Sequence, residues 1–308
     1  MGGRPIGLVF PGQGTQRQAM GAPWRDTPSW EPVTSEISEA TGEDIADLLL
    51  HATTEQLRRT DLAQVSVFSV AMTAHAEAVR RGAFDGPVVA CAGHSLGEYA
   101  ALTAAGAYTL SAAAALVAAR GRAMREASGA REGTMGVLVA APLESVEHLV
   151  DGVRQEGADV WVANVNAPGQ TVVSGSPEGV GRVADGASSI GAKFIRLQVG
   201  GAFHSPYMAP AAEALAAALK DTAAAPRHLP VVANVDARPY DGAVGWTELG
   251  TRQLTSPVLW EESVRTLTGA LGCGRLVEIG PGRTLAGLIR RIDPGVEVVS
   301  VDGPAALD

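Results

Sequence analysis

The residues Gly-His-Ser-Leu-Gly at positions 93–97 have the form Gly-x-Ser-x-Gly, a spacing that can present a serine as a nucleophile. Residues 86–92 are short and apolar, which predicts a strand, and residues 98–105 are rich in alanine, which predicts a helix. A tight turn between a strand and a helix is the context in which this pattern forms a nucleophile elbow, because glycine permits the cramped backbone. The pattern therefore predicts Ser95 as a nucleophile; the alternative is a glycine-rich turn that carries an idle serine.

A nucleophilic serine needs a base, and the chain has six histidines. His94 adjoins Ser95 in sequence, so on an elbow its side chain should point away from the hydroxyl. His204 lies in a glycine-rich loop, residues 199–206, that leaves a predicted strand. Loops at strand ends carry catalytic groups more often than helix faces do. This placement predicts His204 as the general base.

Arg120 interrupts an apolar helix face. In the helix predicted for residues 111–127, it shares the i, i+3, i+4, i+7, i+11 face with four apolar residues, Ala113, Leu116, Val117 and Met124. A guanidinium close to a core costs several kcal/mol unless a carboxylate or hydrogen bonds meet it. Periodicity alone leaves two readings open: a structural ion pair or outward-reaching side chain, and a binding group for an anion.

Several motifs occur in the order seen in one enzyme family. They are Phe-Pro-Gly-Gln-Gly-Thr-Gln at 10–16, Gly-His-Ser-Leu-Gly-Glu at 93–98 and Ala-Phe-His-Ser at 202–205, joined by the segments 163–170 and 278–282. From about residue 6 to residue 290 the chain resembles malonyl-CoA:acyl-carrier-protein transacylases, the stand-alone relatives of polyketide-synthase acyltransferase domains. Ordered motifs across a whole chain are more specific than any one of them.

The resemblance implies a ping-pong acyltransferase. It moves a malonyl group from malonyl-CoA, a coenzyme A thioester, to the phosphopantetheine thiol of an acyl carrier protein, for fatty-acid or polyketide synthesis. It further implies no metal, no prosthetic cofactor and a monomer. Three alternatives stay open: a trans-acting transferase for another extender unit, an acyl-thioester hydrolase on the same scaffold, and a catalytically idle module that docks carrier proteins.

The resemblance also assigns roles to single residues. The backbone N–H groups of Gln13 and Leu96 correspond to an oxyanion hole; the alternative for the turn around Gln13 is that it caps a helix. Arg120 corresponds to the arginine that grips the free carboxylate of malonyl groups, a task that suits a planar, bidentate donor. No acidic residue stands out as a partner for the histidine, and the position that corresponds to its orienting backbone carbonyl is Leu259.

Further positions concern the acyl pocket. Phe203, directly before His204, corresponds to a bulky aromatic that accompanies selection of malonyl over methylmalonyl; alternatively its ring packs inward, away from substrate. Gln64 and Gln170 match polar residues near the pocket, with ordinary hydrogen bonding as the competing reading. Asn166 and Asn234 are weaker candidates of the same kind.

The order of predicted elements gives an α/β fold with two domains. An α/β-hydrolase-like large domain with a parallel sheet and the elbow would comprise residues 1–130 and 200–308. Between them, residues 131–199 follow a β-α-β-β-α-β order, which predicts a small ferredoxin-like α+β insertion. Residues from 303 onward are predicted to form a loose tail.

Composition narrows the class of protein. The 308 residues are 46% hydrophobic, enough for a sizeable core, and the net charge of −9 argues against a nucleic-acid binder. An acidic carrier protein would therefore need a local basic patch for docking. The two cysteines have no metal-binding spacing and fit a reduced, cytoplasmic setting. No apolar run of 18 residues suggests a membrane span.

Overall fold

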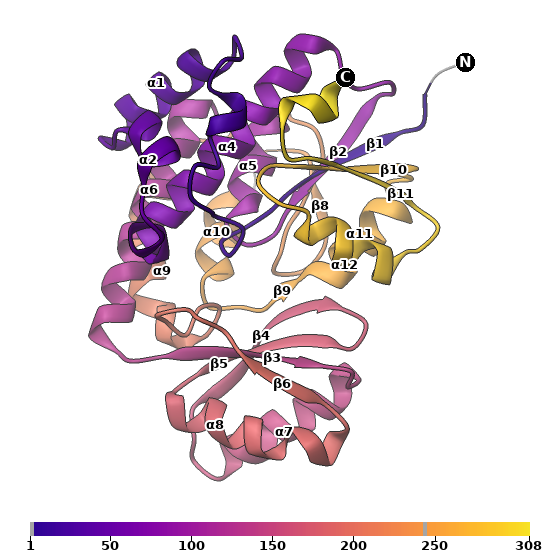
Figure 1. Ribbon diagram of the computed structural model, residues 1–308. Coiled ribbons are helices and arrows are strands. Elements are labelled where there is room, and N and C mark those ends of the chain that lie inside the picture. Colours follow the sequence, from indigo (N-terminus) through magenta and orange to yellow (C-terminus); the bar gives the residue numbers. More distant parts are fainter. Residues whose placement is uncertain (1–2, 243–244) are drawn as a thin grey trace.

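The computed structural model describes residues 3–242 and 245–308, and it contains two β-sheets. In Figure 1 the larger sheet lies among most of the helices, and the smaller sheet lies below it with two helices on its far side. The larger sheet has the order β11-β10-β1-β2-β7-β8. Its strands are β1 (Ile6–Phe10), β2 (Val88–Gly93), β7 (Val231–Val232), β8 (Pro239–Tyr240), β10 (Arg275–Ile279) and β11 (Glu297–Val301).

The central strand β1 is buried along its whole length, as expected for a parallel strand covered on both faces. Alternate side chains enter different cores: Leu8 and Phe10 join one cluster, and Val9 joins another on the opposite face. Both neighbours, β2 and β10, run parallel to β1. The carboxyl ends of these strands therefore lie at one edge, and the turns that follow β1 and β2 meet there.

Helices pack on both faces of this sheet, giving three layers. Those described in this part of the chain are α1 (Trp30–Thr41), α2 (Ile45–His51), α3 (Thr54–Arg58), α4 (Thr60–Arg81), α5 (Gly97–Ala104), α6 (Leu110–Ala130), α9 (Ala209–Lys220), α10 (Trp246–Gln253), α11 (Trp260–Thr268) and α12 (Thr284–Ile292). Short 3-10 turns occur at Ala22–Trp24, Pro206–Met208 and Pro304–Leu307. The glycine Gly121 lets α6 approach α4 closely, because a Cβ there would lie 2.9 Å from the Cα of Asp61.

The smaller sheet has the order β6-β3-β5-β4-β9. Its strands are β3 (Thr134–Val139), β4 (Val160–Ala167), β5 (Gln170–Gly175), β6 (Lys193–Arg196) and β9 (Val258–Leu259), and its helices are α7 (Leu143–Gln155) and α8 (Pro177–Gly186). The first four strands form antiparallel pairs, whereas β9 runs parallel to β4. Those four strands were predicted from the sequence, but β9 was not. Strand β9 is only two residues long, and 90 residues separate it from the end of its partner β4.

The two faces of the smaller sheet have different partners. Val160 and Val173 pack with the apolar faces of α7 and α8 in a core of their own. Met135 and Val172, on the other face, belong to the main core that includes α4, α5 and α6. The smaller sheet thus shares a hydrophobic core with the rest of the chain, and one of its faces is directed toward the carboxyl edge of β1 and β2.

Helix α4 is long and apolar enough to cross a membrane by length and composition, which the sequence analysis overlooked. In the structure, however, 83% of its most apolar 18-residue window is buried inside the molecule. It packs against α1, α5 and α6. The apolar length of α4 is therefore accounted for as the central helix of a protein core.

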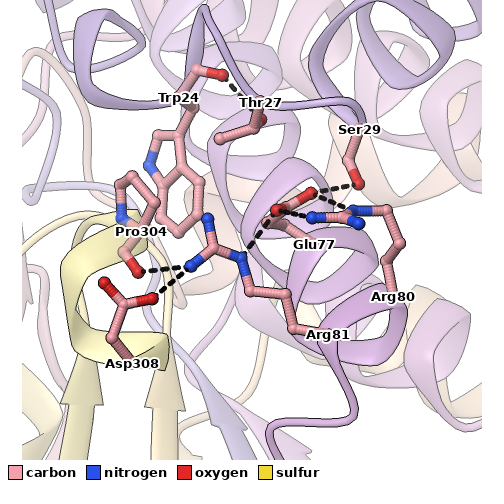
Figure 2. A network of polar contacts seen from close by, with 8 residues as sticks. All are labelled: Trp24, Thr27, Ser29, Glu77, Arg80, Arg81, Pro304 and Asp308. Carbon is pink, nitrogen blue, oxygen red and sulfur yellow. Dashed lines mark hydrogen bonds and ion pairs between the residues drawn. The ribbon is translucent and has the colours of Figure 1, made fainter.

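The prediction of a loose tail from residue 303 is wrong. The Arg81 guanidinium, at the end of α4, donates to the Pro304 carbonyl oxygen at 3.3 Å and to the Asp308 carboxylate at 2.6 Å. Figure 2 shows that the same guanidinium also pairs with Glu77, a buried carboxylate that accepts hydrogen bonds from Ser29 and Arg80 as well. The final turn is therefore held against the end of α4 by charge-assisted hydrogen bonds.

Candidate active site

The elbow around Ser95 is as tight as the glycine pattern requires. Strand β2 ends at Gly93 and helix α5 begins at Gly97, which leaves three residues for the turn. A Cβ on Gly93 would overlap the backbone of Gly97, and a Cβ on Gly97 would overlap the carbonyl oxygen of Phe10 at the end of β1. Ser95 itself has φ +53°, a left-handed conformation that costs a non-glycine residue about 1–3 kcal/mol. Backbone strain here serves to present the hydroxyl.

His204 lies in hydrogen-bonding contact with the elbow serine. Its Nε2 is 2.7 Å from Ser95 Oγ, and its Nδ1 is 2.8 Å from the carbonyl oxygen of Gln253. A carbonyl oxygen only accepts, so Nδ1 carries the proton and Nε2 is free to accept the serine proton. His204 also has a positive φ, +56°.

The predicted role of Leu259 is wrong. The carbonyl that holds the His204 ring belongs to Gln253, at the end of α10. Leu259 lies in β9, where its N–H donates to the Asn234 carbonyl oxygen and its own carbonyl oxygen accepts from Ser263 Oγ. Because β9 pairs with β4, the backbone of Leu259 is part of the smaller sheet.

Burial and the nearby Arg120 charge lower the pKa of His204 to about 3. The imidazole is only 4% exposed. It is therefore neutral at physiological pH, which is the state that accepts a proton from serine.

Arg120 is buried, 1% exposed, at the side of the serine. Its Nη2 donates to Ser95 Oγ at 3.0 Å and to Gln253 Oε1 at 3.1 Å, and its Nη1 donates to Gln64 Oε1 at 2.5 Å. The Nε–H has no partner among the described residues, and no carboxylate of the described ranges lies within ion-pair distance of the guanidinium. Neutral oxygens therefore compensate this cation only in part, which leaves it able to bind an anion.

Behind the elbow lies a buried polar network that the sequence analysis did not identify as a unit. Gln253 Nε2 donates to Glu98 Oε1 at 2.8 Å and to the Ser95 carbonyl oxygen at 3.0 Å. Asn234 Oδ1 accepts a hydrogen bond from the Ser95 N–H, and the Asn234 backbone N–H donates to Glu98 Oε2. An acidic residue at the start of an otherwise apolar helix, Glu98, was the available signal; nothing in the sequence pointed to Gln253.

Burial raises the pKa of Glu98 to about 8, while the N–H of Asn234 and the Arg120 charge act in the opposite direction. The carboxyl group is 2% exposed, and both of its oxygens face N–H donors. Glu98 is thus an ionisable group that lies one residue, Gln253, away from the Arg120 guanidinium.

The two predicted oxyanion-hole residues lie on neighbouring turns. Gln13 follows β1 and Leu96 follows Ser95, and the turns touch because the His94 N–H donates to the Phe10 carbonyl oxygen at 3.0 Å. The backbone N–H groups of Gln13 and Leu96 have no acceptor within the part of the chain that the structure describes. Two free donors beside a serine are the arrangement that can stabilise an oxyanion.

A cavity of about 280 Å³ opens at this edge of the sheet. Seven of the predicted site residues line it: Gln13, Ser95, Arg120, Asn166, Gln170, Phe203 and His204. Its remaining wall comes in part from the smaller sheet, through residues such as Asn164 and Val172. The cavity therefore lies between the two sheets.

The other predicted residues have varied positions. Gln64 is fully buried on α4 and contacts two residues that line the cavity, Arg120 and Met124, without lining it itself. The Gln170 amide oxygen accepts from Arg291 of α12 at 2.6 Å, so it closes one side of the cavity. Asn166 Oδ1 accepts a hydrogen bond from His94 Nε2 at 2.9 Å, and this contact turns the His94 ring away from the serine as expected. Within residues 3–242 and 245–308, no cluster of three His, Cys, Asp or Glu side chains could hold a metal ion.

A strained serine on an elbow, a histidine within hydrogen-bonding distance and two free N–H groups define an acyl transferase site. Residues 8–293 match the family model described as acyl transferase domain. The chain belongs to the malonyl-CoA:acyl-carrier-protein transacylase family within that group.

Named relatives agree with this assignment. Malonyl CoA-acyl carrier protein transacylase of Bacillus subtilis is 35% identical over 305 residues, covering 98% of this chain and 95% of the relative. The crystal structure of MCAT from Mycobacterium tuberculosis superposes with a TM-score of 0.92 at 33% identity, covering 98% of both chains. A malonyl-transacylase in complex with its type II PKS acyl-carrier protein superposes equally well, with a TM-score of 0.92 at 35% identity, covering 98% of this chain and 97% of the other.

Proposed function

We propose that this chain transfers a malonyl group from malonyl-CoA to the phosphopantetheine thiol of an acyl carrier protein through an acyl-serine intermediate. The observation that carries the proposal is Arg120, a buried cation without a carboxylate partner among the described residues, whose Nη2 is 3.0 Å from Ser95 Oγ. An acyl group on Ser95 would lie within reach of this guanidinium. A free carboxylate at the far end of that acyl group, as in malonyl, would supply the missing charge.

In the first half-reaction Ser95 attacks the thioester carbonyl carbon of malonyl-CoA while its proton passes to His204 Nε2. The N–H groups of Gln13 and Leu96 stabilise the oxyanion, each donor contributing a few kcal/mol. When the carbon–sulfur bond breaks, the coenzyme A sulfur takes the proton from His204. Ser95 is left as a malonyl ester, with its carboxylate on Arg120.

In the second half-reaction the thiol of the carrier protein gives its proton to His204 and attacks the ester carbonyl. The same two N–H groups hold the oxyanion, and Ser95 leaves with the proton from His204. The carbonyl oxygen of Gln253 keeps the imidazole in one tautomer throughout. The reaction needs no metal and no prosthetic group, since every proton and leaving group is handled by these residues.

Two other functions of the scaffold predict different outcomes. A hydrolase would release malonate to water, and a docking module would form no covalent adduct. The partly compensated Arg120 favours transfer, because a carboxylate clamp is useful chiefly for a dicarboxylic acyl group.

Mass analysis of the intact protein after brief mixing with malonyl-CoA tests the proposal. A stable mass increase of one malonyl group is expected for the wild type and none for Ser95→Ala, whose fold should be unchanged. Adding holo carrier protein should discharge the adduct onto the carrier. Rapid turnover to free malonate would indicate a hydrolase, and no adduct at all would indicate a docking module.

The same proposal includes the finer description of the fold. The antiparallel order β6-β3-β5-β4 supports a ferredoxin-like insertion at residues 131–199, and the parallel strands β11, β10, β1, β2 and β7 with the elbow support an α/β-hydrolase-like domain at 1–130 and 200–308. We assign the protein to the cytoplasm as a monomer, with coenzyme A thioesters and a carrier protein as its partners.

A further inference from the structure

Glu98 is a buried acid that the proposed mechanism leaves without a task. It lies in the first turn of α5, directly behind the elbow, and is 2% exposed. Its two oxygens accept hydrogen bonds from the Asn234 backbone N–H at 2.6 Å and from the Gln253 side-chain amide at 2.8 Å. Glu98 does not line the acyl cavity.

These contacts fix the orientation of the Gln253 amide. Its nitrogen faces two groups that accept, the Glu98 carboxyl oxygen and the Ser95 carbonyl oxygen. Its oxygen faces a group that can only donate, the Arg120 guanidinium, at 3.1 Å. Turning the amide over would place an NH2 group against the guanidinium and an oxygen against two acceptors.

Arg120 depends on that orientation. The amide oxygens of Gln253 and Gln64 accept hydrogen bonds from its two terminal nitrogens. Because both amides are neutral, they orient the guanidinium and leave its positive charge available to a ligand. An acidic residue in direct contact with the guanidinium would aim it equally well but would neutralise it. Because Glu98 contacts Gln253 and not Arg120, it can orient the guanidinium without neutralising its charge.

We propose that Glu98 is a positioning residue for acyl-group preference: it holds Gln253 so that Arg120 is aimed at the acyl pocket with its charge free for a substrate carboxylate. This inference rests on the proposed malonyl transfer. It concerns preference between acyl groups, since an acetyl group has no carboxylate to bind.

Glu98→Gln is the sharpest test, because only one hydrogen-bonding property changes. A carboxyl oxygen accepts whether or not it carries a proton, whereas an amide nitrogen cannot accept. The Asn234 N–H belongs to the backbone and cannot be reversed, so the new amide must turn its oxygen to Asn234 and its NH2 to Gln253. Gln253 must then turn over and present its own NH2 to Arg120.

The measurement is kcat/KM for malonyl-CoA and for acetyl-CoA, in acylation of the full-length protein, with their ratio as the readout. Glu98→Gln should lower the malonyl-to-acetyl ratio on the order of tenfold, the size of one hydrogen bond to a charged group, mainly through KM for malonyl-CoA. Glu77→Gln, which alters another buried acid that pairs with Arg80 and Arg81 (Figure 2) and does not line the cavity, is the matched control and should leave the ratio unchanged. If Glu98 has a purely structural role, Glu98→Gln will lower kcat/KM equally for malonyl-CoA and acetyl-CoA, and that result would overturn the inference.

Two further variants cover other outcomes. If Glu98→Gln does not fold, Gln253→Met removes the same contact from its other end while keeping the backbone carbonyl that holds His204, and it should lower the ratio similarly; an unchanged ratio contradicts the inference. The double variant Glu98→Gln with Gln253→Glu restores a donor opposite an acceptor but puts an acid directly on Arg120. It should regain stability and keep acetyl transfer without regaining malonyl preference, and full recovery of that preference would also overturn the inference.

Failure of the proposed function would look different. In that case the wild type itself would form no malonyl adduct. A wild type that loads malonyl normally, together with a Glu98→Gln variant of unchanged ratio, would contradict only the role assigned to Glu98.

Discussion

At the scale of single residues, the site is defined by one buried cation that its surroundings do not neutralise. A guanidinium in a protein interior costs several kcal/mol unless it is paired, and among the described residues Arg120 has only the oxygens of Gln64, Gln253 and Ser95 as hydrogen-bond acceptors. Under the proposed function, a substrate carboxylate would supply the missing partner. Substitution of Arg120 should therefore affect substrates according to their charge.

Arg120→Ala should impair malonyl transfer far more than acetyl transfer. The lost charge-assisted, partly desolvated pair is worth roughly 2–4 kcal/mol for the carboxylated substrate. Acetyl transfer loses no such contact. The check is kcat/KM for both thioesters, with Arg122→Ala, an exposed arginine two positions along α6, as control. Equal impairment of both substrates by Arg120→Ala would make the residue structural.

Phe203 should discriminate against a branched acyl group. Its side chain is 6% exposed, lines the cavity and also packs into the main core, so it has little freedom to retreat. Overpacking by an α-methyl group typically costs ~1–3 kcal/mol, which predicts a malonyl preference of about ten- to a few hundred-fold. Competition between malonyl-CoA and methylmalonyl-CoA for one carrier protein measures it, and Phe203→Ser should reduce the preference. A wild type that prefers methylmalonyl would refute the argument.

The pH profile of acylation should show the environment of His204. Because burial and Arg120 lower its pKa to about 3, the imidazole is neutral, and active as a base, throughout pH 5–7. The rate of malonyl-serine formation should therefore stay nearly flat as the pH falls from 7 to 5. Rapid-quench measurements of the adduct give this rate directly. A loss of activity with a midpoint near 6.5 would mean that the histidine has its ordinary pKa.

Site residues that belong to a local sequence pattern could be predicted from the sequence, whereas those that only tertiary packing brings to the site could not. A five-residue motif predicted Ser95. The helical stripe singled out Arg120 but left a structural ion pair open, and only the family resemblance predicted its role as a carboxylate-binding residue. The carbonyl that orients His204 was misassigned to Leu259, because any backbone carbonyl has the same chemistry and only the fold decides which one is near. Gln253 ends a polar, short helix, and nothing in its own segment distinguishes it from a surface residue.

At the scale of elements, the sequence predicts some bounds and misses others. Residues 6–10 predict a strand and residues 143–155 predict a helix, and β1 and α7 have these bounds. Residues 229–234 predict a strand of six residues, but β7 has only two, and the helix predicted for residues 177–190 ends at Gly186 and continues as a 3-10 turn. A side chain at Gly186 would meet Leu149 of α7 at 2.6 Å, so this glycine is kept for close packing at the expense of helix propensity.

The end of α4 offers a prediction about the final turn. Arg80 and Arg81 both pair with Glu77, but only Arg81 also holds Pro304 and Asp308. Arg81→Ala should therefore speed removal of the last residues by carboxypeptidase, while Arg80→Ala should not. Neither substitution should unfold the protein, since each leaves Glu77 with Ser29 and the other arginine as partners. Equal trimming of the two variants would show that Arg81 does not hold the final turn.

At the scale of the whole molecule, the acyl cavity depends on how the two sheets are placed, because each contributes part of its wall. The sequence predicted the insertion but not its attachment, which uses contacts between distant segments. Strand β9 extends the smaller sheet, and Arg291 of α12 donates to Gln170 and to the Pro168 carbonyl oxygen. Such contacts have no local signature, so only the folded chain reveals them.

A third contact joins the segments that enter and leave the smaller sheet. Asp159, just before β4, accepts from Arg131 at 2.6 Å and from the Tyr207 hydroxyl at 3.0 Å, and the Arg131 guanidinium stacks 3.6 Å from the centre of the Tyr207 ring. Arg131 lies three residues before the start of β3, and Tyr207 lies three residues after His204. The cluster of Arg131, Asp159 and Tyr207 thus connects the placement of the smaller sheet to the loop that carries the base.

Asp159→Ala should therefore lower transfer as well as stability. Exposed ion pairs contribute about 0–1 kcal/mol, so the loss of unfolding free energy should be small. The loss of activity should be larger, on the order of tenfold in kcat/KM, because small displacements of reacting groups are costly. Tyr207→Phe, which keeps the ring and removes one hydrogen bond, should have an intermediate effect. Glu156→Ala breaks an exposed pair with Arg182 inside the smaller domain and serves as control. If Asp159→Ala and Glu156→Ala lower kcat/KM equally little, the cluster stabilises the fold without positioning His204.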